Sequence, residues 1–161
     1  MMFKSLKEVI AFAIGREAQA ANFYQVFAAR SEKPATKSMF AELAAEEKKH
    51  QELLEKLTPE QLKNFQPTKL EDLGLDSILK DTQFSPDMEY PGALRMALKR
   101  ETESIRLYSF FAEQLMKDKT ECQTSVERKQ LKQLFDFLVA QEQQHKNKLE
   151  NEYDAVVLKD Y

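Results

Sequence analysis

Hydrophobic positions recur in alternating steps of four and three residues along four long stretches of the chain. This spacing places them on one face of an α-helix, whereas a half-buried strand would alternate with a period of two. Each inward-facing row is apolar over most of its length, and the opposite face carries charged and amide side chains. The pattern predicts four amphipathic helices, over about 5–30, 34–57, 92–117 and 124–153.

Capping residues mark the expected helix starts independently of the hydrophobic pattern. Ser5 with Glu8, and Thr124 with Glu127, have the spacing of a capping box, in which each side chain accepts a hydrogen bond from an orphan backbone N–H. Pro34 is tolerated in the first turn of a helix because its missing N–H would have no partner there. The caps and the hydrophobic rows therefore predict the same helices.

The connections predict how the helices are joined. The first and third links are short, so the helices that they join should be antiparallel neighbours. The segment from about 58 to 90 is long, and we expect it to cross over between the second and third helices, which then run parallel in an up-down-down-up bundle with a left-handed seam. A chain of 161 residues is expected to form one such domain over 1–161.

Composition agrees with an all-α class and narrows the possible functions. The chain has only three glycines and five prolines, so few turns interrupt it, as is typical of an all-α protein. Its 24 Lys and Arg against 27 Asp and Glu give a net charge of -3, which argues against nucleic-acid binding through a basic face. The single Cys122 excludes an internal disulfide or a rubredoxin-type iron site in this sequence. Because no apolar run approaches a membrane span and no signal peptide is evident, we expect a cytoplasmic protein without a membrane partner.

Each inward-facing row is interrupted near its middle by a glutamate. The chain has only two histidines, and both follow such a glutamate by three residues, as Glu-x-x-His. That spacing puts the two side chains on the same helical face, one turn apart. The six inward-facing polar residues are Glu17, Glu47, His50, Glu101, Glu142 and His145.

Four carboxylates in one apolar layer would repel one another, and each would cost several kcal/mol to bury without a counter-charge. Cations between them remove both penalties, and two divalent ions balance four negative charges. Carboxylate and imidazole ligands suit iron, with manganese or zinc as substitutes. Two helices with a lone Glu and two with Glu-x-x-His form the pattern of di-iron carboxylate bundles. We therefore predict that all six residues bind a pair of metal ions.

Two tyrosines add to the pattern. Tyr24 and Tyr108 each lie seven residues, or two turns, after the glutamate of their helix. Their hydroxyls are expected to bond carboxylates held at the metals and so to fix ligand orientation. The two halves of the chain match at these positions, which indicates a duplicated helical hairpin around a pseudo-twofold axis.

The stretches GREAQAANFY (15–24) and AAEEKKH (44–50) resemble the first two ligand motifs of the rubrerythrin family, within the ferritin-like superfamily. The resemblance implies a four-helix bundle that binds two irons without haem, under an oxo or carboxylate bridge. It also implies redox chemistry with hydrogen peroxide or dioxygen, as in protection from oxidative stress. From the resemblance and the symmetry, Glu47 and Glu142 would bridge the metals, while Glu17 and Glu101 would be more terminal.

The chain departs from that family in two ways. Rubrerythrins usually carry a rubredoxin-like iron site that feeds electrons, and with a single Cys122 the donor is expected to be another, rubredoxin-like protein. Peroxide-specialised members also have an extra glutamate one turn after the third-helix ligand, where this chain has Ser104 and Ile105. We still expect a peroxide-reducing oxidoreductase, or one that reacts with dioxygen.

Two other functions fit the same ligands. A bacterioferritin-like ferroxidase or iron-storage protein shares them, but its haem-binding methionine directly follows the second-helix glutamate, where this chain has Lys48. A bundle that binds metal without catalysis is the third possibility.

A few apolar residues are expected on the surface, where they would cover the crossover or form a homodimer face. They are Phe23, Phe110 and Phe137, with the tail 156–158.

Overall fold

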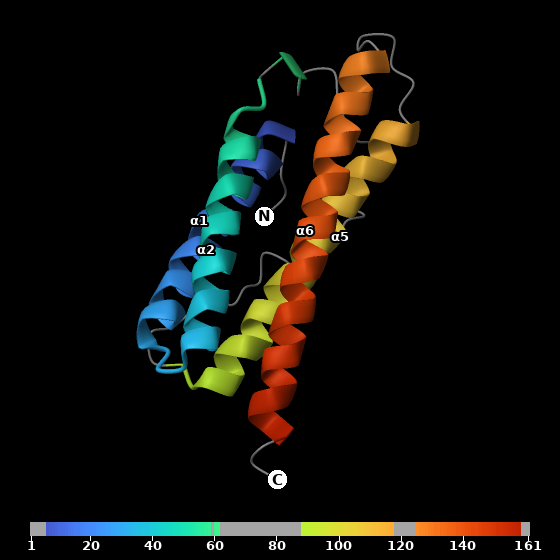
Figure 1. Cartoon of the computed structure of the whole chain (residues 1–161). Helices are drawn as coiled ribbons and strands as arrows, with labels where there is room; N and C mark the ends of the chain where they lie inside the picture. Colours follow the sequence, from blue (N-terminus) through green and yellow to red (C-terminus); the bar gives the residue numbers. More distant parts are fainter. Residues whose placement is uncertain (1–5, 59, 62–87, 118–124, 159–161) are drawn as a thin grey trace. The chain divides into compact units, whose positions relative to one another are not determined.

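The structure is a computed structural model that describes residues 6–58, 60–61, 88–117 and 125–158. It contains the helices α1 (Leu6–Arg30), α2 (Pro34–Glu55), α5 (Tyr90–Lys117) and α6 (Ser125–Leu158), as Figure 1 shows. These ranges contain no strand, so the all-α class predicted from the sequence is confirmed. Among the described residues, no helix is both long enough and apolar enough to cross a membrane.

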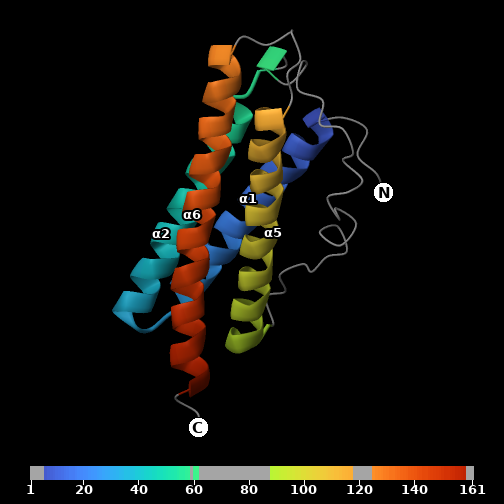
Figure 2. The same cartoon turned by 90° about the vertical axis from the view of Figure 1, so that its right-hand side faces the viewer.

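The chain divides into two compact units, each built on one pair of helices. Helices α1 and α2 lie side by side and antiparallel, and so do α5 and α6, in both Figure 1 and Figure 2. These are the two hairpins that the short links predict. The expected single domain and the parallel course of α2 and α5 stay predictions.

The interior of the α1–α2 hairpin follows the predicted hydrophobic row. Phe40 and Leu43 of α2 are fully buried, and Tyr24 of α1 is 1% exposed. The turn between the helices is closed by Ser31, whose backbone N–H and hydroxyl both donate to the carbonyl of Phe27, at 3.0 and 2.6 Å. Pro34 starts α2, as the sequence predicts.

The α5–α6 hairpin repeats this interior and adds a polar connection near the start of α5. The hydroxyl of Tyr90 donates to Glu152 Oε1 at 2.8 Å, and the Arg95 guanidinium donates to the Tyr153 hydroxyl at 3.4 Å. Burial, together with this hydrogen bond to Glu152, raises the pKa of Tyr90 far above its ordinary value. These contacts tie the end of α6 to α5.

One expectation about the surface was wrong, and one helix is longer than expected. Phe23 does not face outward: it is 5% exposed and its ring packs on Tyr24 and Phe27, with centroids 5.4 and 4.6 Å apart. The reason is that α1 buries a wider face than a strict heptad row covers. The expected tail 156–158 is the last turn of α6, because nothing after Tyr153 breaks a helix. Phe137, by contrast, is exposed at 48%.

Most of the predicted crossover, 62–87, lies outside the described residues, as do the capping residues Ser5 and Thr124. At its start, Thr58 and Gln61 form a reciprocal cap. The Thr58 N–H donates to Gln61 Oε1 at 2.8 Å, and the Gln61 N–H donates to Thr58 Oγ1 at 3.2 Å. This is the geometry of a capping box and marks a helix start there.

Candidate metal centre

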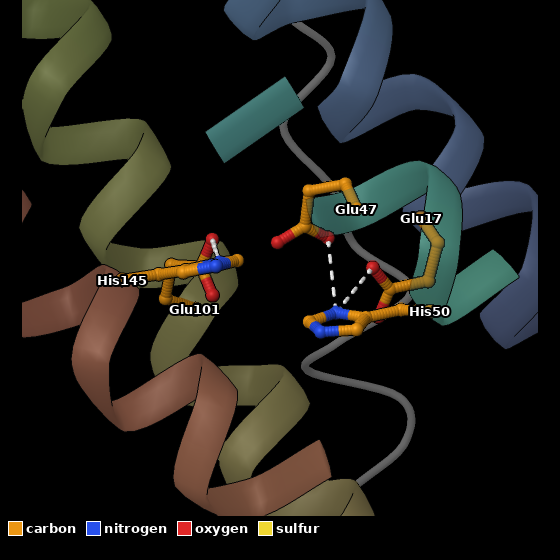
Figure 3. Close-up of polar contacts among 5 residues, drawn as sticks. All are labelled: Glu17, Glu47, His50, Glu101 and His145. Carbon is orange, nitrogen blue, oxygen red and sulfur yellow. Dashed lines mark ion pairs between the residues drawn. The ribbon is translucent and has the colours of Figure 1, made fainter. Parts of the chain in front are cut away.

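The α1–α2 hairpin brings together three of the predicted ligands, Glu17 of α1 with Glu47 and His50 of α2, here called the α1–α2 triad. His50 Nδ1 lies 3.6 Å from Glu17 Oε2 and 3.9 Å from Glu47 Oε2, as the dashed lines in Figure 3 show. All three residues are at most 2% exposed. The Glu-x-x-His spacing places both α2 ligands on the face that packs on α1.

The α5–α6 hairpin contains the other three, Glu101 of α5 with Glu142 and His145 of α6, here called the α5–α6 triad. His145 Nδ1 lies 3.6 Å from Glu101 Oε1 (Figure 3), the same separation as between His50 and Glu17 in the first hairpin. These residues are at most 3% exposed. The two hairpins therefore present the same donor set in the same local arrangement.

Each triad is compact enough to hold a metal ion. Within each one, the three residues offer one ligand atom apiece, and these atoms lie within 4.8 Å of one another. Nitrogen and oxygen ligands bind such ions at about 2.0–2.2 Å, so ligands of one ion lie up to roughly 4 Å apart. Small side-chain adjustments would bring the three atoms onto a shared ion. The donor set, two carboxylates and one imidazole, suits iron, manganese or zinc.

The charges of each triad also fit a divalent cation. Two buried carboxylates less than 5 Å apart repel strongly where water is excluded, and one divalent ion neutralises both. The structure thus buries all six sequence-predicted residues and groups them as three in each hairpin. Their role as metal ligands stays a prediction.

The two tyrosines occupy matching places in the hairpins. Tyr24 and Tyr108 are each 1% exposed, two turns along their helices from Glu17 and Glu101. Side chains on an α-helix lean towards its N-terminus, which for both tyrosines is the direction of the glutamate. Placement and direction suit the predicted contact of the hydroxyls with ligand carboxylates, which stays a prediction.

Sequence reasoning missed one buried charged residue, Arg100, which is only 7% exposed. It directly precedes Glu101, as Arg16 directly precedes Glu17 in the first hairpin. Arg16 is half-buried, with its guanidinium carbon 5.6 Å from the Phe12 ring centroid. The repeated Arg-Glu pair is the signal that could have drawn attention to Arg100, but the hydrophobic rows leave that position outside the core.

Comparison with known proteins identifies one family. The family model described as Rubrerythrin matches residues 8–89, about half of the chain. No curated protein and no solved structure matches. The matched range holds α2 and all of α1 but its first two residues, and with them the whole α1–α2 triad. The α5–α6 triad lies beyond the matched range. Its assignment as a candidate metal site therefore depends on its own geometry, which repeats that of the α1–α2 triad.

Proposed function

This chain belongs to the rubrerythrin family of ferritin-like di-iron carboxylate proteins, and from that premise we propose that it is a non-haem di-iron oxidoreductase that reduces hydrogen peroxide. The observation that carries the proposal is the repeated buried set of two carboxylates and one imidazole in the two hairpins. A single such set could be a structural metal site. Two equivalent sets in one chain supply the ligands of a two-metal centre.

We propose that the two triads together hold both ions. Glu47 and Glu142 would bridge them, Glu17 and Glu101 would bind one ion each, and each ion would take one histidine. Charge supports this assignment, because four carboxylates balance two divalent cations. The repeat supports it as well, since each Glu-x-x-His helix supplies one bridging and one terminal ligand.

The bound irons would supply the two electrons that, with two protons, convert hydrogen peroxide to two molecules of water. The chain's own residues hold and orient that chemistry. The glutamates would hold the ions, and the tyrosine hydroxyls would steady these carboxylates. Leu43 and Leu138 are fully buried, each four residues before a triad glutamate, and would help to keep bulk water from the ligands.

Electrons would come from a rubredoxin-type site, which needs four cysteines and therefore lies outside these 161 residues, which have one. A rubredoxin-like protein is the proposed donor. We also propose a homodimer, for which the exposed Phe137 of α6 offers apolar surface.

A ferroxidase that oxidises iron with dioxygen is the second candidate. The observation that favours it lies on α5, one turn after Glu101, where Ser104 and Ile105 are half-buried and provide no carboxylate. A peroxide reaction that depends on exchange to an extra glutamate at this turn is therefore not open to this chain.

Stopped-flow mixing separates the two candidates. The anaerobic protein loaded with two ferrous ions is mixed with hydrogen peroxide and, separately, with dioxygen, and iron oxidation is followed by absorbance. Faster oxidation by peroxide than by dioxygen supports the proposed reductase, and the reverse order supports the ferroxidase. Oxidation by either reagent no faster than that of free ferrous ion would contradict both and leave a non-catalytic metal-binding role.

A further inference from the structure

Each triad is accompanied by a phenylalanine whose ring stacks on the tyrosine of the same hairpin. In the α1–α2 hairpin the rings of Tyr24 and Phe40 are stacked, with centroids 6.0 Å apart and planes at 25°. In the α5–α6 hairpin Tyr108 and Phe135 stack in the same way, at 6.3 Å and 22°. By contrast, Phe27 packs on Phe40 in a tilted arrangement, at 46°.

The register of the hairpins explains why these rings meet. Tyr24 lies seven residues after Glu17, and Phe40 lies seven residues before Glu47. Because α1 and α2 run antiparallel, both rings sit two turns, about 10 Å, from the triad and on the same side of it. Phe135 lies seven residues before Glu142, so the second hairpin has the same register.

Because the stacked rings are buried, the phenylalanine restricts the orientation of the tyrosine ring. Both phenylalanines are at most 1% exposed, and so are both tyrosines. A tyrosine ring in a close-packed interior can turn only if its neighbours move. The flat face of the phenylalanine therefore sets the plane of the tyrosine ring. Because a phenolic O–H bond prefers to lie in the plane of its ring, the stack also sets the direction in which the hydroxyl can donate to a ligand carboxylate.

We propose that Phe40 and Phe135 are positioning residues of the metal centre, which act by holding the rings of Tyr24 and Tyr108 in place. This inference rests on the proposed function, since it assigns the tyrosine hydroxyls to metal-bound carboxylates. Hydrogen-bonding partners of metal ligands typically contribute 10–100-fold to metal affinity. Because Phe40 acts only through the Tyr24 hydroxyl, its expected contribution to metal affinity is smaller than that of Tyr24.

The first test measures the tyrosine itself in the metal-free protein. Tyrosines are replaced by 3-fluorotyrosine, the Tyr24 signal is assigned with the Tyr24→Phe variant, and exchange between ring orientations is followed by ¹⁹F NMR. Phe40→Leu should speed this exchange at least tenfold. Leu54→Ala is the matched control, because Leu54 is 1% exposed and lies seven residues after Glu47, as far from it as Phe40 but on the other side. Equal exchange in Phe40→Leu and wild type would overturn the inference.

The second test measures Co²⁺ affinity by absorbance titration in a double-mutant cycle. Tyr24→Phe should weaken Co²⁺ binding about tenfold, and Phe40→Leu roughly threefold or more. The double variant should bind no more weakly than Tyr24→Phe alone, because Phe40 acts through the hydroxyl that this variant lacks. A Phe40→Leu effect of undiminished size in the Tyr24→Phe background would show a merely structural role and overturn the inference. So would an equal loss of affinity in Leu54→Ala.

The outcomes for this inference and for the proposed function are distinct. A wild-type chain that binds Co²⁺ while the cycle is additive overturns the positioning role alone. A wild-type chain that binds no Co²⁺ overturns the two-metal centre and the positioning role together. The Phe135, Tyr108 and Leu149 variants repeat the experiment in the second hairpin, where Leu149 is fully buried seven residues after Glu142.

Discussion

Replacing a triad glutamate by glutamine should change stability in opposite directions with and without metal. In the metal-free protein, the ligand oxygens of Glu17 and Glu47 lie within 4.8 Å of each other, where two like charges repel by about 3 kcal/mol at an effective dielectric constant of about 20. Glu47→Gln removes this repulsion while keeping the shape of the side chain. The metal-free variant should therefore be more stable than the metal-free wild type.

The effect is large enough to measure by heating. A gain of about 1 kcal/mol raises the Tm of a domain of this size by about 2–4 °C, so the full repulsion corresponds to a rise of roughly 6–12 °C. With Co²⁺ present the order reverses, because wild type gains binding free energy that the variant loses. The assay is a calorimetric melt in EDTA and a second melt in excess Co²⁺.

Glu46→Gln is the matched control, since Glu46 is the neighbouring residue on α2, is half-buried and lies outside the triad. It should shift neither melt by more than about 2 °C, as expected of most substitutions away from the core. A metal-free Glu47→Gln protein that melts below the metal-free wild type would contradict the proposed repulsion between Glu17 and Glu47. It would show that the Glu47 carboxylate is held by contacts that stabilise the fold, without need of a cation.

Three further predictions follow from the hairpins. Burial and the bond to Glu152 raise the pKa of Tyr90, so the stability that this residue contributes is complete below about pH 10 and is lost above it, where the unfolded phenol ionises. Urea unfolding at pH 8 and pH 11 should therefore show a larger fall in the free energy of unfolding for wild type than for Tyr90→Phe. Leu138→Ala should lower the free energy of unfolding by about 2–5 kcal/mol, because Leu138 is fully buried. The neighbouring Phe137→Ala should cost less than about 1 kcal/mol, because Phe137 is 48% exposed, and a common urea titration compares the two.

The helices and the grouping of ligands within each hairpin could be predicted because both depend on local periodicity. Glu47 and His50 share a helical face whatever surrounds them, since three residues span nearly one turn. Glu17 could be predicted to lie beside Glu47 and His50, because its row on α1 is otherwise apolar and the short link makes α1 and α2 neighbours. The pairing therefore needed no information from distant parts of the chain.

The second buried faces of α1 and α5 could not be predicted in the same way. Phe23 and Arg100 both lie off the heptad rows, and their burial depends on tertiary packing that the local pattern does not encode. The stacking role of Phe40 could not be predicted either, because an inward-facing phenylalanine looks the same in sequence whether it fills space or orients a tyrosine. Its stacking on Tyr24 is visible only in the geometry of the rings.

The proposed centre for two metal ions takes its ligands from both triads, so its metal stoichiometry can be measured. Anaerobic titration with Fe²⁺, followed by removal of free iron and elemental analysis, should give two ions per wild-type chain. The Glu47→Gln/Glu142→Gln double variant should retain well under two, because each substitution removes a charged ligand. Two ions per chain in the double variant, or fewer than one in wild type, would rule out the proposed two-metal centre.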